Sequence, residues 1–137
     1  MKIYVADDSE TERILITTIL DRIETKETKI FDNGLDLWFE CLQDPPDIIL
    51  LDLMLTSLGG LEFLALLRSH RHWERAPVVL VVSSVDPSQI KDEVLRAGAQ
   101  AYFHKPYLPD SLEAAIRSFE RQNTNSEPVV REVSYRG

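Results

Sequence analysis

Short apolar segments alternate with longer amphipathic segments five times along the chain. The short segments are rich in aliphatic and β-branched residues and are too short to form helices, so they predict strands. The strands are expected at Lys2–Ala6, Thr28–Phe31, Asp47–Leu51, Val78–Val82 and Ala101–Phe103. The third and fourth segments, DIILL and VVLVV, do not alternate polar with apolar residues. Continuous apolar runs of this kind are typical of strands that are covered on both faces of a parallel sheet.

Between the strands, apolar residues recur at the spacing of a helix. Ser9 and Glu12 form a capping-box pattern at the start of the first helix, and Gly98 is expected to end the fourth. Helices are therefore expected after Ser9, after the turn at 32–34, over residues 61–69 and 87–97, and onward from Pro109-Asp110-Ser111. The helical period fails from about Gln122.

The alternation of strands and helices with short connections predicts an α/β domain with right-handed crossovers. Five such units favour a flavodoxin-like, doubly wound sheet of five parallel strands in the order 2-1-3-4-5, with helices on both faces. The domain is expected to cover residues 1–121. Residues 122–137 are expected to form a polar tail or the start of a linker.

Composition narrows the class of protein. The 137 residues carry a formal charge of −8, which argues against binding to a nucleic-acid backbone as the main function. The single cysteine, Cys41, excludes an intramolecular disulfide and fits a reducing compartment. Acidic residues interrupt the N-terminal sequence MKIYVADDSE, so no signal peptide or membrane span is expected there. Together these features predict one acidic, soluble, cytoplasmic domain.

In an open α/β sheet, ligands bind beyond the carboxyl ends of the strands, where the strand order reverses. Asp7 and Asp8 follow the first strand and Asp52 follows the third, so three carboxylates are expected to meet there. Their repulsion would raise their pKa values, and a hard cation such as Mg²⁺ would relieve it. A hydroxyl, Ser83, and an ammonium, Lys105, follow the next two strands and are suited to bind a phosphoryl group. The pattern therefore predicts a Mg²⁺-dependent phosphoryl-transfer site with an aspartate nucleophile.

Five motifs support this interpretation. In chain order they are VADDS at 5–9, PDIILLD at 46–52, Gly60, VVSS at 81–84 and GAQAYFHKP at 98–106. In these motifs the chain, from residue 2 to about 121, resembles the receiver domain of two-component response regulators, such as the single-domain chemotaxis regulators. The resemblance implies that Asp52 accepts phosphate from a histidine kinase or a phosphotransfer protein. It also implies a signalling phosphoacceptor that is not an enzyme but catalyses its own phosphorylation and dephosphorylation.

The resemblance further implies how the site is divided among its residues. Asp8 and Asp52 would hold Mg²⁺ together with the backbone carbonyl of Met54. Asp7 would act mainly through water, and Ser83 would contact the phosphoryl group.

A conformational switch is part of the same resemblance. Lys105 would pair with the phosphoryl group, and the Lys105–Pro106 peptide bond would be cis. Ser83 would move toward the phosphate, and Tyr102 would turn inward behind it. The surface of the fourth helix, fifth strand and fifth helix would then repack, so a local change of charge would alter contacts with a partner.

Some positions depart from the family pattern. Thr56 stands where proline is common, Gly59 replaces a common Asp or Asn, and Ser84 replaces a small apolar residue. Because the loop at 53–60 lacks that proline and has an added glycine, it is expected to be mobile.

Met54 and Val85 occupy the two positions at which the family tunes the lifetime of the phosphate. Both side chains are apolar and offer nothing to orient an attacking water. Slow autodephosphorylation is therefore expected.

Two histidines, His70 and His72, lie in the basic stretch RSHRHWER. Two positions apart on a helix, they would not share a face, so a zinc site is not expected. Solvated side chains, or at most a contact patch, are the simpler interpretation.

Two other functions compete with the receiver. A haloacid dehalogenase-type phosphatase also uses an aspartate after an apolar strand, but Met54 stands where its second aspartate is needed. A pseudo-receiver, which binds partners without being phosphorylated, is the second alternative, and the unusual loop around Thr56 keeps it open.

The output of the domain is expected to be a changed protein–protein contact. The chain would be either a complete single-domain regulator or the receiver of a longer protein whose output domain is missing. Neither direct nucleic-acid binding nor membrane association is expected of this chain, and a homodimer is possible through the fourth-helix to fifth-helix face.

Overall fold

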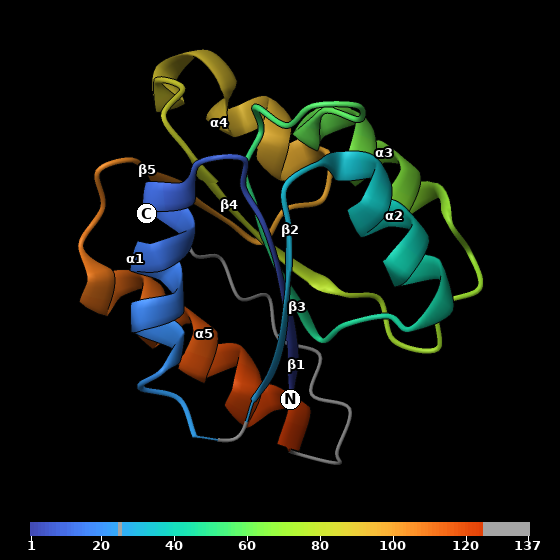
Figure 1. The fold of residues 1–137 in the computed structure, drawn as a ribbon. Coiled ribbons are helices and arrows are strands. Elements are labelled where there is room, and N and C mark those ends of the chain that lie inside the picture. Colours follow the sequence, from blue (N-terminus) through green and yellow to red (C-terminus); the bar gives the residue numbers. More distant parts are fainter. Residues whose placement is uncertain (25, 125–137) are drawn as a thin grey trace.

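The computed structural model describes residues 1–24 and 26–124, which alternate between strands and helices from end to end (Figure 1). The strands are β1 (Lys2–Ala6), β2 (Glu27–Phe31), β3 (Ile48–Leu51), β4 (Val78–Ser83) and β5 (Ala101–His104). The helices are α1 (Glu10–Leu20), α2 (Gly34–Gln43), α3 (Gly60–Ser69), α4 (Pro87–Arg96) and α5 (Pro109–Thr124).

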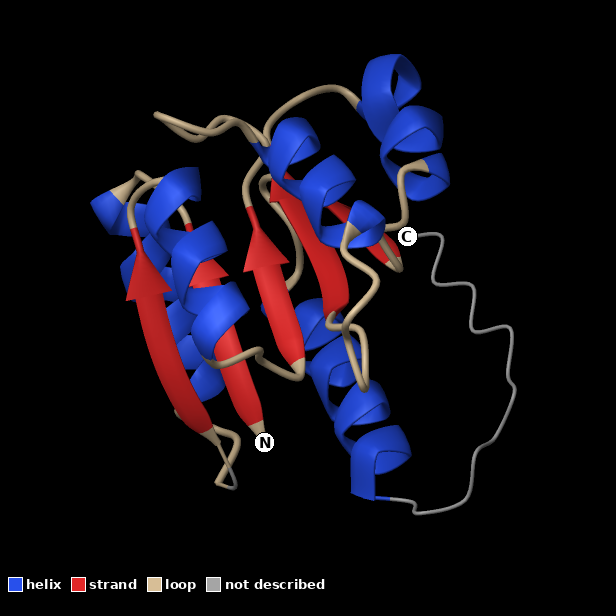
Figure 2. Ribbon diagram, turned by 90° about the vertical axis from the view of Figure 1, so that its right-hand side faces the viewer, coloured by secondary structure: helices blue, strands red, loops and turns tan. Residues whose placement is uncertain are grey.

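The five strands form one parallel sheet in the order β2-β1-β3-β4-β5, so the expected topology is confirmed. Figure 2 shows the strand arrows pointing the same way, with helices in front of and behind them. Because every strand runs in one direction, all five carboxyl ends lie at one edge of the sheet. The order reverses between β1 and β3, and this places the loops after those two strands next to each other.

Each face of the sheet carries its own hydrophobic core. Alternate strand residues such as Ile3 and Leu50 pack with α1 and α5, whereas their neighbours Tyr4 and Leu51 pack with α2 and α3. Strands that bury both faces cannot alternate polar and apolar residues, which explains the continuous apolar segments in the sequence.

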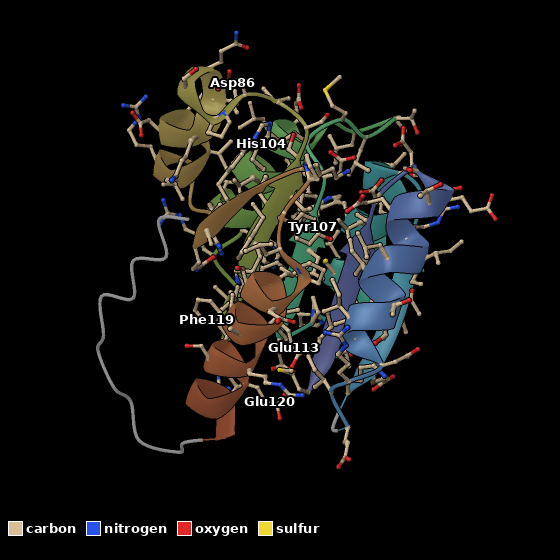
Figure 3. All side chains as sticks on the ribbon, turned by 90° about the vertical axis from the view of Figure 1, so that its left-hand side faces the viewer. Asp86, His104, Tyr107, Glu113, Phe119 and Glu120 are labelled. Atoms are coloured by element: carbon tan, nitrogen blue, oxygen red, sulfur yellow. The ribbon has the colours of Figure 1, made fainter. Side chains whose placement is uncertain are left out.

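Two tethers hold the ends of α1 to the α5 side of the molecule. Glu113, on the side of α5 that faces α1, lies 3.3 Å from the guanidinium of Arg22 (Figure 3). At the other end, the Tyr107 hydroxyl donates a hydrogen bond of 3.0 Å to Glu12. These contacts place the loop before α5 beside the start of α1.

Three helices begin at side-chain caps. Ser9 accepts a hydrogen bond from the backbone N–H of Glu12, as its position before α1 predicts. Asn33 and Asp86 cap α2 and α4 in the same way. The N-cap of α3 is Gly59, which has no side chain to accept a bond.

The boundaries of the elements differ from the sequence expectations by a few residues. β4 and β5 each extend to a polar residue, because Ser83 and His104 pair in the register of the sheet. Helix α5 continues to Thr124, beyond the expected end at residue 121. Backbone hydrogen bonding can continue a helix after its apolar period has ended. The rest of the expected tail, residues 125–137, lies outside the described residues.

No helix in the described ranges combines the length and the apolar character that crossing a bilayer requires.

Gly60 allows α3 to begin directly against the end of β3. A Cβ at this position would lie 2.6 Å from both the carbonyl oxygen of Asp52 and the Cα of Leu53. A Cβ at the preceding Gly59 would meet only the flexible carboxylate of Glu62. The close approach therefore involves the backbone of the aspartate strand itself.

We predict that Gly60→Ala lowers the free energy of unfolding by about 2 kcal/mol or more, because backbone has to move to admit the methyl group. The matched variant Gly59→Ala should cost about 1 kcal/mol or less, since only a side chain has to move. Urea denaturation of both variants measures the difference. Equal losses of stability would show that the contact at Gly60 is not tight.

Candidate functional site

Adjacent pairing of β1 and β3 brings two carboxylates together. Ala6 and Leu51 are paired in the register and end their strands, so Asp7 and Asp52 directly follow the two strands side by side. The Asp52 N–H donates a hydrogen bond of 3.0 Å to the Ala6 carbonyl. Asp7 is 1% exposed and Asp52 is 5% exposed. Both acids are thus largely removed from bulk water.

Asp8 completes the acidic cluster at its solvent side. Each of Asp7, Asp8 and Asp52 offers a carboxylate oxygen, and these oxygens lie within 4.8 Å of one another. Asp8 is exposed, whereas the other two are buried. The cluster is therefore open to solvent on the side of Asp8.

Lys105 supplies the positive charge that faces this cluster. Its Nζ lies 2.9 Å from Asp7 Oδ2 and 3.4 Å from Asp52 Oδ2. Its backbone N–H donates to the carbonyl of Ser83, and the Lys105–Pro106 peptide bond is cis, as the family resemblance implied. The end of β5 thus directs the ammonium across the sheet edge toward β1 and β3.

Burial and charge shift the pKa values of the two central groups. Burial raises the pKa of Asp52, and the negative charge of Asp7 raises it further, while the Met54 N–H and Lys105 act in the opposite direction. For Lys105, burial lowers the pKa, but the hydrogen bond to Asp7 and the charges of both acids outweigh it, so its pKa is raised. The lysine therefore stays protonated while Asp52 holds a destabilised negative charge.

Ser83 and Tyr102 meet at Val85, next to the acidic cluster along the sheet edge. The Ser83 hydroxyl is fully buried and accepts a hydrogen bond of 3.2 Å from the Val85 N–H. The Tyr102 hydroxyl donates a bond of 2.5 Å to the Val85 carbonyl, and its ring is buried. In this structure Tyr102 already points inward.

Met54 contacts Asp52 through its backbone, since its N–H donates a bond of 3.2 Å to Asp52 Oδ1. Its side chain is 63% exposed. The metal-binding role foreseen for the Met54 carbonyl stays a prediction.

The loop after β3 is tied to the loop after β2, which the sequence analysis missed. Thr56 pairs with Asn33 in an isolated bridge, and the Ser57 hydroxyl donates a hydrogen bond of 3.1 Å to Asn33 Oδ1. Ser57 has a φ of 63°, which is uncommon for a residue with a side chain. The loop that lacks the common proline thus has a specific anchor, while its expected mobility stays a prediction. The asparagine before Gly34 was recognised only as part of a turn.

Two further residues hold the Asp7 strand end. The Ser9 N–H donates a hydrogen bond to Asp7 Oδ1, and the Arg13 guanidinium donates one to the Asp7 carbonyl. Each of these bonds is 2.9 Å long. Arg13 was also missed, because nothing in its spacing distinguishes it from a solvated residue in the first turns of a helix.

Comparison with known proteins adds a decisive observation to this geometry. The profile of the response regulator receiver domain matches residues 3–117. The chain belongs to the response regulator receiver domain family. Receiver domains of this family are signalling proteins of two-component systems and not enzymes in the usual sense. The match favours the receiver over the dehalogenase-type phosphatase.

Curated relatives of this receiver domain differ in length. "Transcriptional regulatory protein KdpE" of Mycobacterium tuberculosis is 35% identical over 97 residues, which cover 68% of this chain and 41% of that protein. "DNA-binding response regulator MtrA" of the same species is 30% identical over 128 residues, 93% of this chain and 54% of that protein. A "Chemotaxis protein CheY homolog" of Campylobacter jejuni is 27% identical and is matched over 89% of its length. The receiver domain therefore spans about half or less of the first two relatives.

Solved structures agree on the fold. The receiver domain of Francisella response regulator 1452 has a TM-score of 0.78 at 24% identity, covering 89% of this chain and 98% of that one. The response regulator domain of Thermotoga maritima CheB has a TM-score of 0.72 at 26% identity, covering 93% and 98%.

We predict that Asp52→Asn raises the melting temperature at neutral pH, without added metal, by on the order of 3 °C. A carboxyl whose pKa is raised by folding holds its proton more tightly in the folded state than in the unfolded chain. Its ionised form therefore costs stability at neutral pH, and this cost fades as the pH falls through the raised value. The amide removes the charge at nearly constant volume.

The matched control is Asp92→Asn on the exposed side of α4, for which no change is expected. Calorimetry at neutral pH and again near pH 4 measures both variants. A lower melting temperature for Asp52→Asn at neutral pH would mean that its ion pair with Lys105 outweighs burial and repulsion.

Proposed function

We propose that this receiver domain is a phosphoacceptor, which takes a phosphoryl group on Asp52 from a histidine kinase or phosphotransfer protein with the help of Mg²⁺. One observation carries the proposal. The three carboxylates of Asp7, Asp8 and Asp52 lie within 4.8 Å at the sheet edge, with the Lys105 ammonium 3.4 Å from Asp52. A pseudo-receiver would need neither the cluster nor the lysine.

The acidic cluster fits a hard divalent cation. Three carboxylate oxygens at this separation repel one another, and among the described residues the Lys105 ammonium is the one side-chain cation paired with them. Oxygen donors of this kind, with open positions for water, are the set that Mg²⁺ prefers. Asp8 and Asp52 would hold the ion with the Met54 carbonyl, and Asp7 would act through water. When bound, Mg²⁺ neutralises charge on the carboxylates and on the incoming phosphoryl oxygens.

The transfer itself uses Asp52 as nucleophile. One carboxylate oxygen of Asp52 attacks phosphorus, the P–N bond to the donor imidazole breaks, and the imidazole nitrogen keeps the electron pair. Lys105 already lies beside Asp52 and would pair with a phosphoryl oxygen after transfer. Ser83, buried at the end of the neighbouring strand, would turn its hydroxyl to another of these oxygens.

The signal would leave the site through Val85. The Ser83 hydroxyl and the Tyr102 hydroxyl bind the N–H and the carbonyl of this one residue. Movement of Ser83 toward phosphate would break the first bond and shift the loop that holds Tyr102. The surface of α4, β5 and α5 would then change its contacts with a partner.

The partner depends on the protein in which the receiver acts. Relatives named as transcriptional or DNA-binding regulators are longer than this chain, whereas the chemotaxis relative is nearly covered by it. An output domain that follows α5 in a longer protein and a separate partner protein are both consistent with these lengths. In either case we place the switch in the cytoplasm, where phosphohistidine donors of two-component systems are made.

Acetyl phosphate with Mg²⁺ should add one phosphoryl group to the protein, seen by intact mass, and Asp52→Ala should abolish the gain. Omitting Mg²⁺ should also abolish it, because the carboxylates then repel the anionic donor. Lys105→Gln should keep the domain folded and reduce the phosphorylated fraction by about tenfold, since one charge-assisted contact is lost.

The control for folding is the melting temperature of each variant. No mass gain in the folded wild-type protein, together with no change of fold on adding beryllofluoride, would contradict the phosphoacceptor and favour the pseudo-receiver.

The phosphate on Asp52 should hydrolyse slowly, over many minutes or longer. Met54 is two residues past Asp52 and Val85 is two past Ser83, and neither side chain can orient a water molecule. Met54→Gln should speed hydrolysis by about tenfold, because an amide at this exposed position can hydrogen-bond water beside the phosphate. Loss of the added mass with time measures both rates. A lifetime of seconds in the wild-type protein would contradict this prediction.

A further inference from the structure

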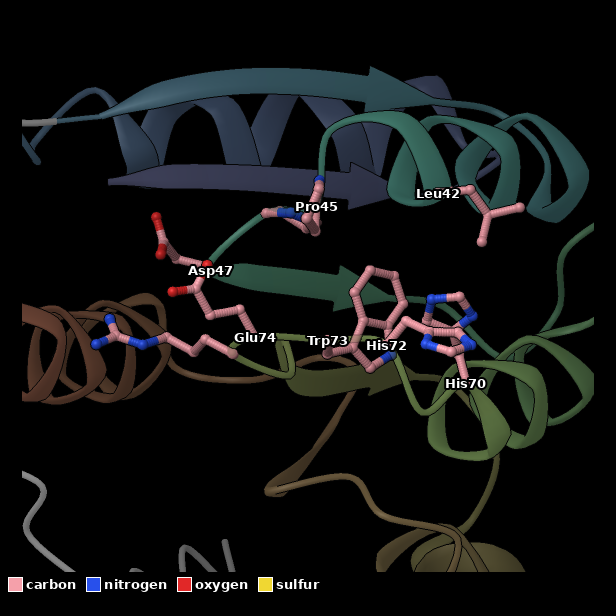
Figure 4. Close-up of a pocket in the computed structure, with 9 residues that line it drawn as sticks. Leu42, Pro45, Asp47, His70, His72, Trp73 and Glu74 are labelled. Carbon is pink, nitrogen blue, oxygen red and sulfur yellow. The ribbon is translucent and has the colours of Figure 1, made fainter.

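Two histidines lie in the loop between α3 and β4, beside the end of α2 at Leu42 (Figure 4). Helix α3 ends at Ser69, so His70 and His72 are not on a helix, contrary to the spacing argument made from sequence. His70 has φ −74° and ψ 121°, an extended conformation. The rings of His70 and His72 contact each other, so both project to one side of this loop. The reason for excluding a metal there does not apply.

The rings of His70 and His72 stand against each other at 5.5 Å between centroids, with their planes at 75° (Figure 4). Two imidazoles that bind one metal ion through nitrogens at about 2.0–2.1 Å place their ring centroids about 5 Å apart. His72 is exposed, whereas His70 is half-buried. A small rotation of one exposed ring would therefore bring the pair to a chelating distance.

A cavity of about 750 Å³ borders the two rings. Its wall includes the carboxylates Asp47 and Glu74, the ring of Trp73 and the end of α2 at Leu42 (Figure 4). In the described part of the chain, no third protein ligand joins the two imidazoles in a compact set. The remaining coordination positions would belong to water, for which the cavity has room.

We propose that His70 and His72 bind a divalent late transition-metal ion, with Cu²⁺ bound most tightly and Zn²⁺ less tightly. Imidazole nitrogen suits copper, nickel and zinc, whereas Mg²⁺ prefers oxygen, so the ion would not be exchanged for the one at the acidic cluster. With two protein ligands, the dissociation constant is expected in the micromolar range.

The protein carries its own reporter for this site. Both of its tryptophans stand beside His70, with Trp73 at 4.3 Å and Trp38 at 6.2 Å between ring centroids. Bound Cu²⁺ quenches indole fluorescence at such short range, because its open d shell offers a rapid path out of the excited state. Zn²⁺ has a filled d shell and does not quench, so it can serve as a competitor.

Titrating the full chain with Cu²⁺, in the presence of millimolar Mg²⁺, should quench most of the tryptophan emission, and excess Zn²⁺ should restore it. His72→Gln should weaken the apparent affinity by about tenfold or more, because one of two nitrogen ligands is removed. His72 is exposed, so this variant removes one nitrogen ligand without opening a space in the hydrophobic core. His70→Gln should have the same effect.

His104→Gln is the matched control, since the third histidine of the chain lies at the end of β5 and should leave the titration unchanged. Equal quenching in the wild-type protein and in both variants at positions 70 and 72 would overturn the proposal. Equal loss of affinity in His104→Gln would overturn it as well.

Discussion

The arrangement of the site depends on the parallel pairing of β1 with β3. This pairing buries the carboxylates of Asp7 and Asp52 side by side. Burial increases the free-energy cost of their mutual repulsion, because little water screens it. Lys105 reaches them from β5 and keeps its proton. The edge of the sheet therefore holds a balance of two buried negative charges, one exposed negative charge and one ammonium. Such a balance is easily changed by a cation or by a phosphoryl group.

Short contacts connect the loops that carry the acidic cluster to the neighbouring helices. Gly60 lets α3 begin against the backbone of Asp52, and Asn33 holds Thr56 and Ser57 on the far side of the same loop. A change at Asp52 would thus be felt by α3 and by the start of α2. On the other side, the Val85 backbone joins Ser83 to Tyr102, because its N–H donates to the Ser83 hydroxyl and its carbonyl accepts from the Tyr102 hydroxyl. The site is therefore joined to α2, α3 and the loop before α4 through short contacts.

Much of the fold could be predicted from local sequence features. Apolar runs without alternation identified strands with two buried faces, and Ser9 identified the start of α1. Element ends were less predictable, since Ser83 joins β4 through pairing with β5 and α5 continues beyond its apolar period. The placement of Asp7, Asp8, Asp52 and Lys105 at one edge followed from strand direction alone. Their division into two buried acids and one exposed acid did not.

The sequence by itself determined the alternation of elements, the class of sheet and the edge at which the acidic residues gather, because each follows from periodicity and strand direction along a continuous segment. Only the tertiary structure decided which loops touch. It set Asn33 against Ser57, directed Lys105 to Asp7, and placed His70 and His72 after the end of a helix with their rings in contact. These contacts depend on where a backbone turns out of its helix or strand and on which element then lies across from it. The position of the turn and the identity of the facing element are both determined by packing against residues that are distant in the chain.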